Sequence, residues 1–204
     1  MSTRDNIIRK AYLCIDEVYP DSTNQDMPAF NIDEFIDQAA RIVIMLAPTR
    51  ALGAGTDMLK HEELEIETTD DGMAVLSLPS TFKRLISICA NEWPHSVNVA
   101  LDSDSPKYLQ QGNKVLRGSL QRPVVFLLEG NTKMEVYSVK KMPIAIDSFK
   151  EFKGLLFDKV DDNYPEKLHD ITAWKTAELV LSTFNNIEAA QMCQNHVQEI
   201  LQSL

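Results

Sequence analysis

Cysteine is scarce in this chain of 204 residues, which contains three: Cys14, Cys89 and Cys193. Their odd number and wide spacing favour neither a disulfide framework nor a paired zinc site, so we expect three small buried side chains.

Long apolar runs are absent as well. The longest covers residues 42–47, whereas a membrane-spanning helix needs roughly 20 apolar residues, and the N-terminus lacks the apolar stretch of a secretion signal. We therefore expect a protein made in the cytoplasm, with no membrane partner.

Basic residues are in the minority, with 20 Lys and Arg against 30 Asp and Glu, which gives a net charge of −10. A protein with this charge repels the phosphate backbone of nucleic acids instead of condensing on it. The charge therefore disfavours a nucleic-acid-binding protein. It is compatible with a surface past which DNA slides without specific binding.

The sequence also lacks the motifs of common catalytic and metal sites. It contains no Gly-x-Gly-x-x-Gly, no Walker lysine, no Gly-x-Ser-x-Gly elbow and no His-x-x-x-His pair. Residues 102–105 begin like a calcium loop but lack its glycine and its closing glutamate. His61 beside Glu62 and Glu63 is more typical of a solvated strand end than of a metal site. We expect no catalytic residue, no metal ligand and no cofactor, and hence no enzyme.

Apolar residues at helical spacing predict two helices in the N-terminal quarter of the chain. The first covers about residues 3–19, with Ser2 or Thr3 as its N-cap, and the second runs from a cap at Asn31 to Ala47. The predicted core face of the first helix consists of Ile8, Ala11, Tyr12, Ile15, Val18 and Tyr19.

The most informative segment is the last, residues 165–204, whose periodicity is helical. A first apolar seam contains Trp174, Ala177, Leu181 and Phe184. After Asn185 and Asn186 a second seam begins, rotated by roughly 100° at 3.6 residues per turn, and it contains Ala190, Cys193, Val197, Ile200 and Leu204. We expect the first seam to belong to the core and the second to dock on another protein. Residues 187–204 would then be dispensable for folding.

Trp93, beside Pro94, is the other side chain that suggests a contact residue, with core packing as the alternative. The candidate assembly interface therefore comprises Ala190, Cys193, Val197, Ile200, Leu204 and Trp93.

Between the helical ends the period changes to two, which predicts strands. Leu64 and Ile66 alternate with glutamates, Asp71-Gly72 supplies a tight turn, and residues 75–78 return as a second strand. Residues 82–89 and a second hairpin over 123–138 are predicted as further strands, with one helical turn near Tyr108 between them.

These elements predict an α+β fold: a helical bundle formed by the N- and C-terminal helices, with an inserted small antiparallel β subdomain. The expected boundaries are 1–60 for the N-terminal helices, 61–141 for the β subdomain, 142–164 for a linker and 165–204 for the C-terminal helices.

Several segments together carry a resemblance to a known family. They are the two capped N-terminal helices, Leu78-Pro79-Ser80-Thr81-Phe82-Lys83-Arg84-Leu85, Gln110-Gln111-Gly112-Asn113-Lys114 with Arg122-Pro123-Val124, and the helix that begins Ile171-Thr172-Ala173-Trp174-Lys175-Thr176-Ala177. With these features the chain resembles the head-tail connector (adaptor or ring) proteins of short-tailed bacteriophages. It is most similar to the portal-proximal ring protein of crAss-like phages.

The resemblance implies a structural virion protein at the head-tail interface, with no catalytic residue and no cofactor. About twelve copies would form a ring beneath the portal through heterologous contacts. The ring would join the capsid to the tail as a DNA conduit, and its partners would be the portal protein and tail or second ring proteins. The alternative is a non-enzymatic cytosolic protein-binding module that acts as a monomer or dimer. Oligomeric state distinguishes the two.

Overall fold

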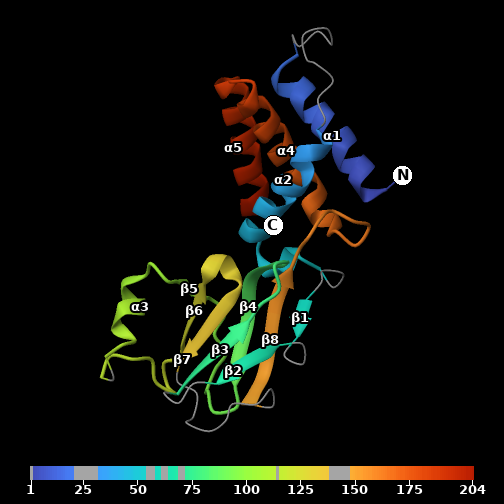
Figure 1. The fold of residues 1–204 in the computed structure, drawn as a ribbon. Coiled ribbons are helices and arrows are strands. Elements are labelled where there is room, and N and C mark those ends of the chain that lie inside the picture. The colour runs from blue at the N-terminus through green and yellow to red at the C-terminus, as the bar shows by residue number, and fades with distance from the viewer. Residues whose placement is uncertain are drawn as a thin grey trace. The chain divides into compact units, whose positions relative to one another are not determined.

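The computed structural model describes residues 2–20, 32–53, 58–60, 64–68, 72–113, 115–137 and 148–204. The chain forms two compact units, of which one combines Met1–Thr56 with Asp158–Leu204 and the other is Asp57–Phe157. The first unit contains helices and the second contains two sheets (Figure 1). The predicted α+β class with antiparallel sheets is confirmed.

The helical unit contains α1 (Thr3–Val18), α2 (Asp33–Leu46), α4 (His169–Thr183) and α5 (Ile187–Ser203), with short 3-10 turns at Thr49–Ala51 and Glu166–Leu168. Helix α4 packs against α1, α2 and α5 and is the central element of the unit. It buries side chains on several sides, and most of them are small or β-branched: Ile171, Thr172, Ala173, Thr176, Ala177, Val180 and Leu181. Small side chains let three neighbouring helices approach one central helix.

Polar contacts close the helical unit around this core. Arg4 of α1 pairs with Asp33 (2.5 Å) and Asp37 (2.8 Å) of α2, and Asp37 also accepts a hydrogen bond from the Val160 backbone N–H (2.9 Å). These two carboxylates raise the pKa of Arg4, chiefly through their hydrogen bonds to it. The buried Tyr164 and Thr172 hydroxyls lie 2.7 Å apart. The N-terminal helices and the returning C-terminal segment are therefore joined by hydrogen bonds as well as by packing.

The helix caps in the structure agree in part with the caps predicted from the sequence. Ser2 caps α1 in a reciprocal capping box with Asp5, whose pKa is lowered by the Ser2 contacts. The expected cap at Asn31 lies outside the described residues. The cap position of α2 is occupied by Ile32, which makes no side-chain capping bond. At the start of α5 the Asn186 side chain accepts a hydrogen bond from the Ala189 N–H (3.3 Å).

Three residues of the second apolar seam, Ala190, Cys193 and Val197, are part of the core of this unit, and the expectation that they lie open to a partner is wrong. Cys193 is 0% exposed, and Ala190 and Val197 are also buried, because α5 packs along α4. Ile200 and Leu204 are half-buried. The seam rotates because the helix ends near Asn185, which has a positive φ of 58°. The chain then turns back as an αα-hairpin, and residues 187–204 complete the core instead of extending away from it.

The β unit contains two sheets. A three-stranded antiparallel sheet has the order β1 (Met58–Lys60), β8 (Phe149–Leu156), β4 (Phe82–Ala90). A five-stranded sheet has the order β2 (Glu65–Thr68), β3 (Met73–Ser77), β7 (Lys133–Tyr137), β6 (Val124–Leu128), β5 (Leu101–Asp102), antiparallel except for the β5–β6 pair. Both predicted strand pairs are present, and buried residues of both sheets belong to one hydrophobic cluster.

Part of the expected linker over 142–164 is a strand. Residues Phe149–Leu156 form β8, the central strand of its sheet, with β4 and β1 on either side. The pairing of β4 with β8 shifts register between Leu85 and Ser87 and between Cys89 and Ala90, so its alternation is irregular. This irregularity explains why the segment shows no clean period of two. The first boundary also differs, since Met58–Lys60 pairs with β8 and belongs to the β unit.

Replacing Val197 by aspartate tests whether the second seam is core. Val197→Asp buries an unpaired carboxylate between α5 and α4, and we expect a loss of about 3–5 kcal/mol in the free energy of unfolding. The matched control is Gln198→Asp, one residue further along and exposed, which we expect to stay within about 0.5 kcal/mol. Denaturant titration followed by circular dichroism measures both. Equal stability of the two variants would mean that α5 does not pack on α4.

A second test concerns the close packing of β8. A Cβ added to Gly154 would lie 2.6 Å from a ring carbon of Phe82 and 3.0 Å from one of Phe152, and both rings are buried. We expect Gly154→Ala to cost about 1–3 kcal/mol. At Gly112 the nearest atom to an added Cβ is 3.7 Å away, an ordinary contact, so Gly112→Ala should leave the melting temperature unchanged or slightly raised. Differential scanning calorimetry of the two alanine variants checks this contrast.

Candidate functional site

The exposed large apolar side chains of the β unit all lie, among the described residues, in the connection from β4 to β6. They are Val99, Leu109, Val115, Leu116 and Leu120. Four of them belong to residues 105–123, which we call the arm and which includes α3 (Pro106–Gln110). Figure 1 shows α3 standing off to one side of β5, β6 and β7. Leu109 is 84% exposed and Val115 is 88% exposed, values that are unusual for apolar side chains in an ordered segment.

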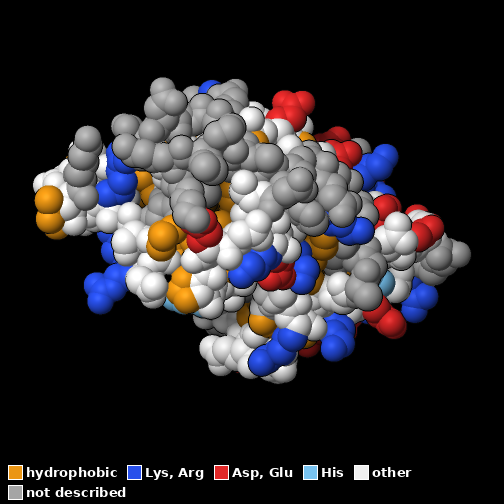
Figure 2. Space-filling view, turned by 90° about the horizontal axis from the view of Figure 1, so that it is seen from below, with side chains coloured by type: hydrophobic (Ala, Val, Ile, Leu, Met, Phe, Trp, Pro, Cys, Tyr) orange, Lys and Arg blue, Asp and Glu red, His pale blue; other side chains and the backbone are white. Residues whose placement is uncertain are grey.

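The arm is also the basic part of an acidic protein. Residues 105–128 contain Lys107, Lys114, Arg117 and Arg122 and no acidic residue. The sequence of the helical unit, by contrast, has 16 acidic and 8 basic residues, a net charge of −8. At the left-hand margin of Figure 2, on the side where the arm lies in Figure 1, apolar and basic side chains are next to each other. The arm therefore combines exposed apolar area with a local positive charge.

The Gln111 side chain connects two parts of the arm by hydrogen bonds. Gln111 is 4% exposed although it is polar. Its amide nitrogen donates to the Lys107 carbonyl (2.8 Å), and its amide oxygen accepts from the Gly118 backbone N–H (3.0 Å). Its own carbonyl accepts from the Arg117 guanidinium (2.9 Å). One side chain thus joins the helical turn to the segment that returns through Gly118.

Tyr108 fixes the base of the arm on the five-stranded sheet. Its ring makes an edge contact with Phe126 of β6 at a centroid distance of 5.1 Å, and Phe126 makes a similar contact with Tyr137 of β7 at 5.8 Å. Glu135 accepts hydrogen bonds from the Tyr108 hydroxyl (3.5 Å) and the Tyr137 hydroxyl (2.8 Å). Burial, and then the Glu135 carboxylate, raise the pKa of both tyrosines. The two hydroxyls therefore stay protonated and keep donating at neutral pH.

The Arg117 guanidinium completes this base, because its central carbon lies 5.6 Å from the centroid of the Tyr137 ring. The arm is consequently anchored at its base and held across its middle, while Leu109, Val115 and Leu116 face water. An ordered segment that exposes apolar side chains has already lost the conformational entropy that binding would otherwise cost. This arrangement is typical of a protein-binding surface.

The helical unit has a surface of complementary character on α1, which we call the α1 stripe. It consists of Tyr12, Leu13, Asp16, Glu17 and Tyr19, all of them exposed. Tyr12 and Tyr19 were expected on the core face of this helix, but the residues that α1 buries are Ile7, Ala11, Cys14 and Ile15. The burial stripe is thus rotated from the predicted one toward Cys14, and both tyrosines lie outside it.

Trp93 does not belong to the surface, and its assignment to an assembly interface is wrong. It is 2% exposed and belongs to the hydrophobic cluster of the β unit. Packing in a core, the alternative interpretation, is what the structure shows. Of the six candidate interface residues, Ala190, Cys193, Val197 and Trp93 are therefore core residues, and Ile200 and Leu204 are half-buried at the end of α5.

The sequence of the arm carries a signal of its own. The predicted helical turn near Tyr108 is confirmed as α3, and residues 110–114 and 122–124 were singled out only for a family resemblance. The decisive pattern is four basic residues in 24 positions without an acidic one, in a chain with 30 acidic residues. The same loop also contains leucine and valine, apolar residues that are uncommon in a basic surface loop and therefore indicate a contact surface.

The cysteines, His169 and His196 make contacts inside the fold. Burial raises the pKa of the Cys14 and Cys193 thiols to about 12, and Cys89 is buried as well. His196 stacks on Trp174 at 4.3 Å, and a His169 ring nitrogen lies 3.2 Å from the Tyr164 carbonyl. His61 lies outside the described residues. Within the described ranges no three His, Cys, Asp or Glu side chains are grouped as a metal site would require.

No helix in the described part of the chain has both the length and the apolar character needed to cross a bilayer. Comparison of the sequence with models of known protein families and with curated proteins finds no match.

Gln111 and its neighbour Gln110 allow a matched test of the arm. We expect Gln111→Ala to raise the rate of tryptic cleavage within the arm about tenfold, because it removes the two hydrogen bonds of the side-chain amide. Gln110 is exposed, so Gln110→Ala should be cut like the unchanged protein. Mass spectrometry of timed digests measures the rates, and the melting temperature of each variant should change little. Equal cleavage of the two variants would contradict the role given to Gln111.

Proposed function

We propose that this chain is a structural virion protein: a head-tail connector that forms a ring beneath the portal of a short-tailed bacteriophage and joins the capsid to the tail as a DNA conduit. The observation that carries the proposal is the ordered, basic and apolar arm on an otherwise acidic protein. The resemblance of residues 78–85, 110–114 and 171–177 to this family supports it from the sequence side.

The chemistry of the two surfaces favours a contact between the arm and an acidic surface over a dimer in which two arms meet. In a two-fold dimer formed through the arm, two basic segments would face each other, and their repulsion would oppose association. A heterologous contact instead places the arm against a different, acidic surface and leaves each copy with one free arm and one free acceptor. Such a contact repeats, and it closes into a ring when the rotation between copies allows. A monomeric binding module makes no such contact, and a two-fold dimer makes it only if each arm binds the acidic surface of the other copy.

The charge distribution also suits a conduit for DNA. If the arm is covered by protein in the assembly, the four basic residues of residues 105–128 are taken up by protein contacts. The rest of the chain carries 16 basic and 30 acidic residues, so a channel wall built from it attracts DNA phosphates only weakly. DNA then passes without specific binding.

Serine substitutions in the arm test the proposed assembly. Leu109→Ser combined with Leu116→Ser removes exposed apolar area without touching the core, so we expect ring formation on purified portal protein to be lost while the melting temperature stays within about 2 °C. The control is Val99→Ser, which is also exposed but lies outside the arm, and it should assemble normally. Electron microscopy of the mixtures counts the rings.

Normal assembly of the double serine variant would show that the arm is not the assembly surface. Unchanged protein that stays monomeric at high concentration, and that neither binds a portal nor occurs in particles, would contradict the connector proposal itself.

A further inference from the structure

The arm exposes apolar side chains beside basic ones, and the helical unit carries a surface of complementary chemistry. We propose that the arm of one copy binds the α1 stripe of a second copy of this chain. This inference deepens the proposed connector function and rests on it, since it names the surface that each arm meets.

The α1 stripe forms one broad face of a helix. Tyr12, Asp16 and Tyr19 follow at steps of four and three, and Leu13 and Glu17 are four residues apart, so these side chains are neighbours on the outside of α1. Each is exposed. The stripe therefore offers apolar and aromatic area together with two carboxylates, whereas the arm offers Leu109, Val115 and Leu116 together with Lys107 and Arg122.

The charge at this end of α1 is unfavourable for the isolated helix. A helix C-terminus carries a partial negative charge and favours basic side chains. The last turn of α1 contains no basic residue, and Asp16 and Glu17 lie close to that end. A positively charged partner removes the resulting repulsion on binding. A basic segment that binds the stripe therefore gains more electrostatic free energy than it would at a helix end without acidic side chains.

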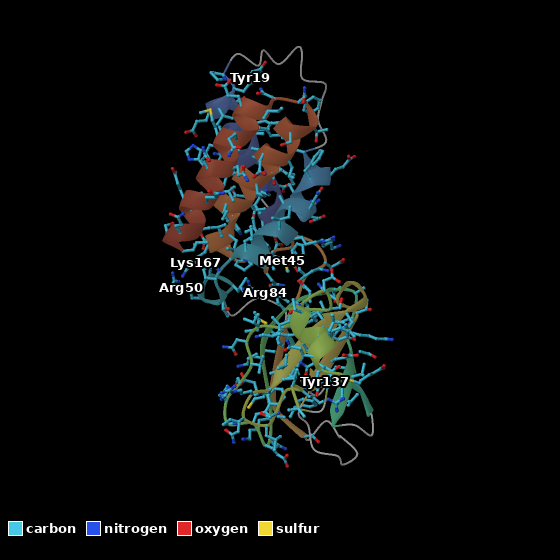
Figure 3. The ribbon with its side chains drawn as sticks, turned by 90° about the vertical axis from the view of Figure 1, so that its left-hand side faces the viewer. Tyr19, Met45, Arg50, Arg84, Tyr137 and Lys167 are labelled. Atoms are coloured by element: carbon cyan, nitrogen blue, oxygen red, sulfur yellow. The ribbon has the colours of Figure 1, made fainter. Side chains whose placement is uncertain are left out.

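Other exposed apolar groups of the helical unit match the arm less well. Met45 and Leu46 end α2, with Arg41 one turn before Met45 and Arg50 a few residues later. Figure 3 shows Met45 and Tyr19 at opposite ends of the helical unit. Residues 38–56 contain these two basic residues and no acidic one, so they repel a basic arm, whereas Arg9, one turn before Leu13, is outweighed by Asp16 and Glu17 of the α1 stripe. Phe184 and Ile187, at the α4–α5 turn, have a single neighbouring carboxylate in the sequence, Glu188.

Disulfide trapping between copies tests the pairing directly. Full-length Leu109→Cys protein is mixed with full-length Leu13→Cys protein under mild oxidation, and the mixed disulfide is measured by mass spectrometry. The control mixture pairs Leu109→Cys with Glu199→Cys, an exposed position on α5 outside the stripe. The native cysteines are buried and do not compete. We expect at least about ten times more mixed disulfide with Leu13→Cys than with Glu199→Cys. Equal yields would overturn the inference.

Charge exchange provides a second measurement on the same mixtures. Lys107→Glu with Arg122→Glu in the arm copy should lower the yield of mixed disulfide about tenfold, and so should Asp16→Lys with Glu17→Lys in the α1 copy. Mixing the two reversed copies should restore the yield, because the charges are again opposite. Failure of the exchange to restore any yield, with all variants folded, would show that these groups do not pair.

The outcomes separate this inference from the proposed function. Loss of portal-bound rings in the arm variant, without preferential trapping at Leu13, would keep the connector proposal and place the arm on another surface. Preferential trapping without recruitment to a portal would show self-association in a protein that is not a connector. A chain with both cysteines that links internally faster than two copies link to each other would show that the arm binds its own helical unit, which overturns the inference.

Discussion

The burial of α4 among three other helices is the constraint on which the fold of the helical unit depends. This helix belongs to the C-terminal part of the chain, whereas α1 and α2 belong to the N-terminal part. The core of the unit is therefore complete only when both ends of the chain have come together. The β unit lies between those ends in the sequence, so the folding of the helical unit requires closure of a long loop, which is entropically costly. The hydrogen bond from the Val160 backbone N–H to Asp37 joins the two ends of the chain and stabilises that closure.

The two units divide the work of the proposed assembly. The helical unit is acidic and offers a helical stripe, and the β unit supplies a rigid base for the arm through Tyr108, Phe126 and Tyr137. Rigidity at the base and exposure at the tip are both needed, because a flexible arm would lose its conformational freedom on binding and weaken the contact. Gln111 provides the rigidity with the amide of one side chain.

Much of the fold could be predicted from the sequence, since helical spacing marked α1, α2, α4 and α5 and a period of two marked both hairpins. Two physical effects account for the errors. The positive φ of Asn185 ends one helix and starts another, and assigning the rotated second seam to a docking surface misplaced Val197 on the outside. The register shifts of β4 against β8 blur the alternation of a central strand. The arm was missed because its signal combines charge with exposure, and exposure is known only from the tertiary structure.

The buried thiols have a consequence for the proposed role as a virion protein. With a pKa of about 12 for Cys14 and Cys193, only about one molecule in 10⁵ carries a given thiolate at pH 7. Oxidants attack the thiolate and not the neutral thiol. If the proposed role holds, the protein sits in a particle that has no reductase outside its host, and burial of the protonated sulfurs protects the core from such damage. In that role, burial of the thiols takes the place of the disulfide bonds that extracellular proteins commonly use.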